Sequence, residues 1–267
     1  MAHPGIAVAE SALRARKLDR TLTTALPPLD RGDGGACTAT DMPALDAALR
    51  GGLPRGQLSE IAGPRSSGRT TLLLQMMAAA TARGDIAALV DTFDRLDVAS
   101  AVTAGIDASR LLWIRGQAIS KTEAATDPQW VPGDARPGGG ARGAHGLVER
   151  AVDRALKALN LVLQAGGFAL VAIDLADVPL VALRRVPFTT WLRVQRTIEG
   201  SDTACVLVVP EPLARSAGGV TLALGGQAAW TGGADRSRRL AGLDIAARIV
   251  SPRRRVEGDV ALAARWE

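Results

Sequence analysis

The chain contains Gly63-Pro64-Arg65-Ser66-Ser67-Gly68-Arg69-Thr70-Thr71, between a run typical of a buried strand, 57–62, and one typical of a helix, 70–83. The glycines of this stretch permit backbone angles that let successive N–H groups converge on an anion. The beginning of the helix adds its positive dipole end. A strand, a glycine-rich loop and a helix in this order predict a phosphate-binding loop.

The loop departs from the usual pattern G-x-x-x-x-G-K-[ST] at one fixed position, where Arg69 replaces lysine. The planar arginine fork can bind phosphate, but it is bulkier than the compact lysine ammonium. We therefore expect weakened nucleotide binding by Gly63, Ser66, Ser67, Gly68, Arg69, Thr70 and Thr71. The alternative is a glycine-rich turn that keeps its shape for packing and binds nothing.

A second element, Leu170-Val171-Ala172-Ile173-Asp174, has four apolar residues that end in a carboxylate. Alone this pattern is common and weak evidence. About a hundred residues after a phosphate-binding loop, it is typical of the strand whose aspartate holds the water shell of Mg²⁺. We expect Thr70 and Asp174 to form the metal site.

Hydrophobic patterning predicts an α/β fold with a central, mostly parallel sheet flanked by helices. Predicted strands cover 57–62, 86–90, 111–114, 168–174 and 204–209, and predicted helices cover 41–50, 70–83, 98–105, 147–164 and 189–199. Three further segments, 222–224, 245–250 and 260–264, read as β-rich. Residues 1–40 are expected to form an N-terminal helical arm and linker, 41–267 one domain, and 126–146 a disordered insertion rich in glycine and proline.

Composition narrows the function classes. The formal net charge is +5 and the pI is near 10.1, which favours a polyanionic partner. The alternative is a genome of high GC content, which encodes Arg in place of Lys and gives the same balance. With no Tyr, three Phe and five Trp, stacking on bases is not expected to dominate binding. Two distant cysteines and two histidines argue against zinc sites and histidine catalysis. Without an apolar leader or membrane span, we expect a cytoplasmic protein with no membrane partner.

The segments around the loop resemble the core of the RecA recombinases. The resemblance rests on Leu45-Asp46-Ala47-Ala48-Leu49, Gly51-Gly52-Leu53-Pro54-Arg55-Gly56-Gln57-Leu58-Ser59-Glu60-Ile61, Arg83-Gly84-Asp85-Ile86-Ala87-Ala88-Leu89-Val90-Asp91 and Gly105-Ile106-Asp107. It is detailed over 41–114 and looser through Asp174 and 205–209. It implies a RecA-like P-loop core, ATP and Mg²⁺ as cofactors, Asp97 as an adenine contact, single-stranded DNA as a partner and possible homo-oligomers.

The departures from RecA are informative. Phe93 stands at the position of the catalytic glutamate, and Phe cannot activate water. Ser100 replaces the tyrosine that stacks on adenine, and Pro210-Glu211 replaces a glutamine sensor. The regions that lead into the DNA-binding loops are short here, 175–186 with Arg184 and Arg185, and 211–221 with Arg215. The resemblance implies that these three arginines contact DNA.

A RecA-like core without the catalytic glutamate, the P-loop lysine and the glutamine sensor resembles the ImuA group. These are RecA-like accessory proteins of bacterial damage-induced mutagenesis. The resemblance implies DNA repair in the SOS response, translesion synthesis, and an ImuB-like polymerase-related protein or RecA as partner. The competing hypothesis is a DNA-stimulated ATPase that tolerates Arg69 and recruits Asp91 or Asp94 as its base. A strand-exchange filament is less favoured, because the DNA-contacting segments are short.

Three further features leave alternatives open. Arg236, Arg238 and Arg239, with Arg253-Arg254-Arg255, form two basic clusters that either contact DNA phosphates or make a solvated edge. Without interleaved aromatics, they are not expected to read bases. The basic helix predicted over 11–26 either packs locally or docks on a neighbour or on RecA.

Overall fold

A computed structural model gives the structure of residues 36–119, 146–214, 219–232, 237–251 and 256–265. The chain divides into two compact units, Met1–Gly34 and Gly35–Glu267, and every described residue belongs to the second. The predicted helical arm and residues 126–145 of the predicted insertion lie outside the described residues, as does the basic cluster 253–255. Gly146 is described, and it caps the helix that follows.

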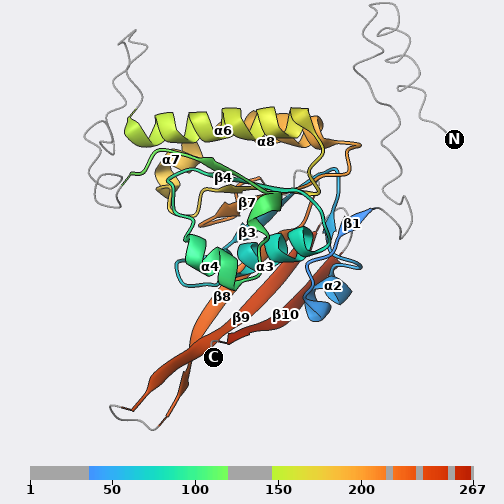
Figure 1. Cartoon of the computed structure of the whole chain (residues 1–267). Coiled ribbons are helices and arrows are strands. Elements are labelled where there is room, and N and C mark those ends of the chain that lie inside the picture. The colour runs from blue at the N-terminus through green and yellow to red at the C-terminus, as the bar shows by residue number, and fades with distance from the viewer. Residues whose placement is uncertain (1–35, 120–145, 215–218, 233–236, 252–255, 266–267) are drawn as a thin grey trace, which may run out of the picture. The chain divides into compact units, whose positions relative to one another are not determined.

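The second unit is built on a mixed sheet with the order β10-β9-β8-β3-β7-β6-β4-β5 (Figure 1). Pairing is parallel from β8 to β5, and β8, β9 and β10 pair antiparallel. The strands are β3 (Gln57–Ala62), β4 (Ala87–Asp91), β5 (Leu111–Arg115), β6 (Leu170–Asp174), β7 (Ala204–Val209), β8 (Thr221–Thr231), β9 (Arg239–Ser251) and β10 (Val256–Arg265). A small separate sheet pairs β1 (Cys37–Thr38) with β2 (Leu53–Pro54). The predicted α/β class with a mostly parallel sheet is confirmed.

Helices cover both faces of this sheet, which explains why its central strands are apolar throughout. They are α2 (Pro43–Ala48), α3 (Arg69–Ala82), α4 (Val98–Thr103), α6 (Leu147–Ala165), α7 (Leu180–Arg185) and α8 (Phe188–Ile198), with a 3₁₀ turn η2 (Ala108–Arg110). One buried cluster joins the sheet to α6, α7 and α8, and the other joins it to α2, α3 and α4. In Figure 1, α6 and α8 lie on one side of the sheet and α3 on the other.

Alternation along the strands assigns each side chain to one of these two clusters. On β6, Val171 and Ile173 face α6, whereas Leu170 and Ala172 face α3. Trp191 on α8 and Cys205 on β7 belong to the α6 cluster, as their apolar surroundings in the sequence predict. Burial raises the pKa of the Cys205 thiol to about 12. A thiol held neutral in this way is a small hydrophobic side chain, not a reactive group.

Among the buried polar side chains, Gln195 and Glu60 make hydrogen bonds that connect distant segments. Gln195 on α8 accepts from the Leu58 amide at 2.8 Å and donates to the Gly56 carbonyl at 3.1 Å, which ties α8 to the beginning of β3. Glu60 on β3 accepts from the amides of Leu213 and Ala214 at 2.8 and 2.7 Å. These bonds fix the segment after β7 beside the strand that leads into the glycine-rich loop.

The structure differs from the sequence-based expectation in two places. Residues 175–186, expected as a shortened loop, contain the helix α7, which buries Ala182 and Leu183. The three short β segments expected near the C-terminus are long strands, β8, β9 and β10, joined as a meander. None of the helices in the described ranges is long and apolar enough to span a bilayer.

Candidate nucleotide site

The glycine-rich loop joins the carboxyl end of β3 to α3, as the sequence predicts. Ser66 and Gly68 have left-handed backbone angles, with φ of 61° and 89°, and Gly68 is the N-cap of α3. Left-handed residues next to ordinary ones turn consecutive N–H groups toward one point, which makes a concave anion site. The first amides of α3 add donors that have no partner within the helix. The backbone therefore has the form of a phosphate cradle.

The meander supports this loop from behind. A Cβ at Gly226 of β8 would lie 2.7 Å from the Ser66 carbonyl oxygen, and one at Gly68 would lie 2.4 Å from Cδ1 of Ile245 on β9. At Gly226 only glycine lets the two backbones approach so closely, whereas Gly68 meets a side chain and needs glycine for its φ of 89°. The shape of the loop thus depends on β8 and β9, two strands far from it in the sequence.

The hydroxyl groups of the loop fit a bound phosphate and metal. Ser67 is buried, and its Oγ has no hydrogen-bond partner within the described residues. Such an orphaned donor is costly unless a ligand or water satisfies it. Thr70 and Thr71 are exposed on the first turn of α3, where a hydroxyl can reach a metal ion.

Arg69 does not extend into solvent. It is buried at 7% exposure, and its Nη1 lies 3.5 Å from the Ala176 carbonyl oxygen, just beyond β6. Burial lowers the pKa of the Arg69 guanidinium, and the nearby carboxylates of Asp174 and Asp177 oppose that shift. The guanidinium therefore lies between the loop and the end of β6, among the acidic groups.

Asp174 lies at the carboxyl end of β6, in register with Asp91 on β4. Burial raises the pKa of Asp174 to about 6, and the neighbouring Asp91 and Asp177 add to the shift. The Ala176 amide, which donates to Asp174 Oδ1 at 2.8 Å, and the charge of Arg69 act in the opposite direction. Asp174 and Arg69 thus lie close enough to interact electrostatically, and their roles at a metal and a phosphate site stay predictions.

The side of the site that would activate water is built differently. Phe93 is 3% exposed and belongs to the cluster on the α6 face of the sheet, whereas α3 and its loop lie on the other face. Asp91 is also buried, and it accepts from the amides of Arg95 and Leu96 at 2.8 Å each and from Trp113 Nε1 at 3.1 Å. A carboxylate with three donors is held as a structural acceptor.

Asp94 and Asp97 also have partners. Asp94 binds the Arg115 guanidinium through two hydrogen bonds of 2.8 Å, and this contact lowers the pKa of the Asp94 carboxyl. Asp97, the predicted adenine contact, is the N-cap of α4, and its carboxylate accepts from the Ser100 amide at 2.9 Å. It is exposed, so its cap does not bar a ligand from approaching.

Two of the three predicted DNA-contacting arginines are among the described residues. Arg184 and Arg185 are exposed at the end of α7 and pair with Glu211 at 3.0 Å and Glu149 at 2.7 Å. Arg215 lies outside the described residues. Exposed ion pairs of this kind contribute little to stability, so a phosphate can compete for both arginines.

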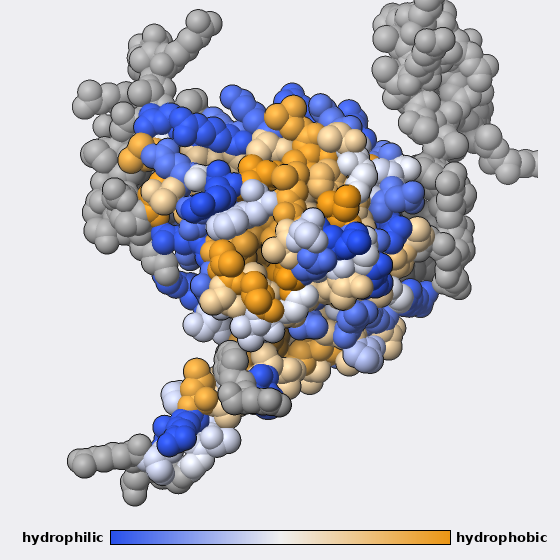
Figure 2. Space-filling view, in the orientation of Figure 1, coloured by the Kyte–Doolittle hydropathy of each residue, from blue (hydrophilic) through white to orange (hydrophobic). Residues whose placement is uncertain are grey.

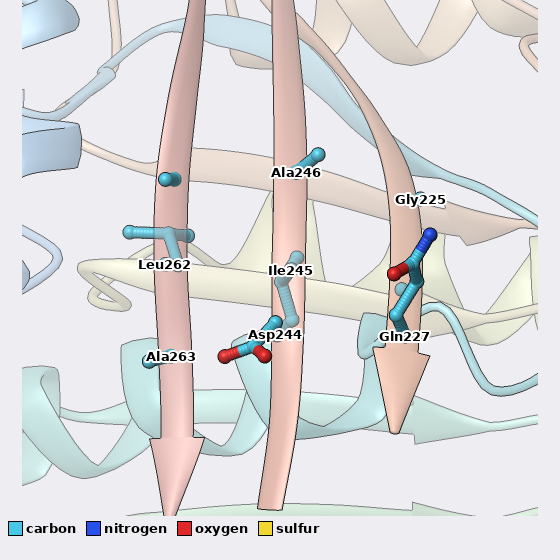
Figure 3. A pocket seen from close by; sticks show the side chains of 9 residues that line it. Gly225, Gln227, Asp244, Ile245, Ala246, Leu262 and Ala263 are labelled. Carbon is cyan, nitrogen blue, oxygen red and sulfur yellow. The ribbon is translucent and has the colours of Figure 1, made fainter. Parts of the chain in front are cut away.

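A groove of about 580 Å³ lies on the meander, where Gly226 and Ile245 are among the residues that line it but no residue of the loop is. Figure 3 shows the side chains of Gln227 on β8 and Asp244 on β9 at this groove, among small and aliphatic side chains. No arginine or lysine lines it, and Asp244 is paired with Arg265. Its charge does not suit a phosphate, so the loop remains the candidate nucleotide site.

Comparisons with known proteins agree with this geometry. Residues 36–124 match the family model of the RecA N-terminal domain. RecA of Synechococcus elongatus is 48% identical over 68 residues, which cover 26% of this chain and 19% of that protein. RecA of Prochlorococcus marinus is 34% identical over 117 residues, or 39% and 32% of the two chains.

These matches support the RecA superfamily. RecA of Chlorobium chlorochromatii, 46% identical over 87 residues, covers 30% of this chain and 25% of that RecA. The RecA-like match thus spans only about a fifth to a third of the length of these relatives. The match to the family model contains the loop, β4 and Phe93, and it ends before α6, β6 and the meander.

Proposed function

We propose that this protein is a RecA-like accessory factor of DNA damage tolerance that binds ATP at an altered P-loop and does not turn it over. Its role would be assembly with DNA and with a partner such as RecA or an ImuB-like polymerase-related protein. Translesion synthesis within the SOS response is the process that the ImuA resemblance suggests. Association of several copies is consistent with the RecA-like core.

The observation that carries this proposal is the position of Phe93 in the apolar core, where RecA has its catalytic glutamate. The phenyl ring of Phe93 can neither orient nor deprotonate a water molecule. The competing ATPase hypothesis needs Asp91 or Asp94 as a base. Asp91 is held by three donors and Asp94 by Arg115, so neither is placed as a free acceptor.

Nucleotide binding is supported by the cradle around Ser66 and Gly68 and by the orphaned hydroxyl of Ser67. The amides of the loop would hold the phosphates, Asp97 would approach the base, and Thr70 and Asp174 would hold Mg²⁺. Bound Mg²⁺ would supply positive charge against the phosphate oxygens. Arg69 already lies near Asp174 and partly neutralises it, so metal binding has to displace that interaction.

The proposal is tested by titrating a fluorescent ATP analogue with Mg²⁺ into the wild type and into Arg69→Ala and Arg69→Lys. We expect saturable binding, weakened about tenfold in Arg69→Ala because one charge-assisted contact is lost. Arg69→Lys should bind at least as well as the wild type, since lysine is the more compact cation. Binding that is absent in all three proteins would show that the loop is a packing turn, and identical binding in all three would show that Arg69 does not contact the nucleotide.

A further inference from the structure

The end of the β8–β9 hairpin extends beyond the strands around it (Figure 1). In the described residues, β3 pairs with β8 only over residues 221–223, and the pairing of β10 with β9 ends at Gly242. Residues 230–231 of β8 and 239–241 of β9 therefore form a two-stranded ribbon. A ribbon with so few neighbours buries little of its surface and is open to a ligand on its sides.

Two large apolar side chains are exposed on this ribbon. Trp230 on β8 is paired with Leu240 on β9, and the two are 48% and 52% exposed. Neither belongs to the two buried clusters of the described residues, so the packing of the core does not account for them. An exposed pair that the fold does not require points to a binding role.

Positive charge accompanies this pair. The Arg238 guanidinium carbon lies 4.7 Å from the centroid of the Trp230 ring, which places the cation over one face of the indole. Arg239 follows it and is exposed, and the described residues 225–232 and 237–243 contain no carboxylate. Figure 2 shows strongly hydrophilic and hydrophobic side chains next to each other on this projecting end.

We propose that this ribbon is a contact site for single-stranded nucleic acid, with Trp230 stacking on a base and Arg238 and Arg239 binding the adjacent phosphates. The stacked guanidinium holds the indole in place, so its exposed surface is presented with little loss of side-chain freedom. Base–aromatic stacking beside backbone-binding cations is the chemistry that binds single strands without sequence preference. The site adds to the DNA-binding role proposed above, on which it rests.

The sequence showed no aromatic residue interleaved with the basic clusters, so base reading was not expected of them. In the structure β8 brings Trp230 beside Arg238 from the other strand, and stacking on one aromatic ring needs no base reading. An acidic protein segment is the competing occupant, since tryptophan, leucine and arginine also form protein-binding surfaces. The two adjacent arginines, with no carboxylate in the described residues 225–232 and 237–243, favour the nucleic acid.

The test is fluorescence anisotropy of the full-length protein with a labelled oligo(dT) of 20 nucleotides at two or more salt concentrations. Loss of one stacked base in Trp230→Ala should weaken binding about tenfold, and Trp230→Phe should restore most of it. Trp230→Leu keeps an apolar side chain but no aromatic face, so it should bind as weakly as Trp230→Ala. Removing both Arg238 and Arg239 should lower the salt slope by about 1.4.

Arg110→Ala is the matched control, because Arg110 is exposed beside β5 at the opposite edge of the sheet. It should bind like the wild type, and thermal melts should show that every hairpin variant is folded. Equal affinity of the wild type and Trp230→Ala would overturn the hairpin site and leave the DNA-binding role intact. If Trp230→Leu binds as tightly as the wild type, Trp230 does not act by stacking on a base. If the wild type does not bind the oligonucleotide, both the hairpin site and the proposed DNA-binding role are refuted.

Discussion

The predicted phosphate-binding loop and the segment 91–94, where the RecA resemblance places the group that activates water, are built differently. The loop has two left-handed residues, and β8 supports it through a close backbone contact at Gly226 that only glycine permits. On the other side, Phe93 is in the core, and Asp91 and Asp94 are occupied by structural partners. A cradle needs backbone shape, whereas hydrolysis needs one free carboxylate in one position, so the first function can outlast the second.

The largest effect is expected from Phe93→Glu, which restores the residue that the RecA resemblance implies. Because Phe93 is buried among apolar side chains, the new carboxylate would be desolvated and the free energy of unfolding should fall by about 4 kcal/mol. ATP turnover should not appear. Phe93→Leu, a milder change, should cost about 1 kcal/mol. Chemical denaturation and a phosphate-release assay measure both. A stable Phe93→Glu protein with turnover would mean that the side chain reaches the nucleotide.

A smaller effect is expected from the titration of Asp174 in metal-free buffer. Its pKa of about 6 exceeds the ordinary value of 3.8, so the folded protein binds this proton more tightly than the unfolded chain. The resulting stability is full below pH 4 and is lost as the pH rises to about 6, a change of at most about 3 kcal/mol. Asp174→Asn should flatten this part of the curve of unfolding free energy against pH. If the unfolding free energy of Asp174→Asn changed with pH as steeply as that of the wild type, the raised pKa of the Asp174 carboxylate would be contradicted.

The smallest effect is expected from Asp94→Asn. Asp94 pairs with Arg115 at the surface, and such pairs contribute little. The variant should melt like the wild type and leave any residual turnover unchanged. If Asp94→Asn abolished a DNA-stimulated turnover, Asp94 would be the base that the competing hypothesis requires. The two sides of the site would then not differ as described.

The sequence predicted the parallel core well because each of its strands is a short apolar run with clear boundaries. The predicted bounds of β3 and β7 agree with the structure, and α6 begins at the predicted residue. The loop, Arg69 and Asp174 follow from spacing and local pattern. The helix α7 was missed, although Pro179 before an apolar stretch is a signal for a helix beginning.

Contacts that depend on strand register could not be predicted. The approach of Gly226 to Ser66, and of Arg238 to Trp230, follows from how β8 and β9 pair across a turn and an irregularity between Ala229 and Trp230. Local sequence does not encode that pairing. The three donors to Asp91 likewise include Trp113, which only the neighbouring strand supplies.

The central claim, a cradle that binds nucleotide without turning it over, is tested most directly by phosphate release. The assay would use purified protein with Mg²⁺ and ATP, with and without single-stranded DNA, and with Arg69→Ala and Asp174→Ala as references. We predict release no faster than in the two variants, under conditions where the wild type binds the ATP analogue. DNA-stimulated release that both variants lose would contradict this and would make the protein a RecA-like ATPase.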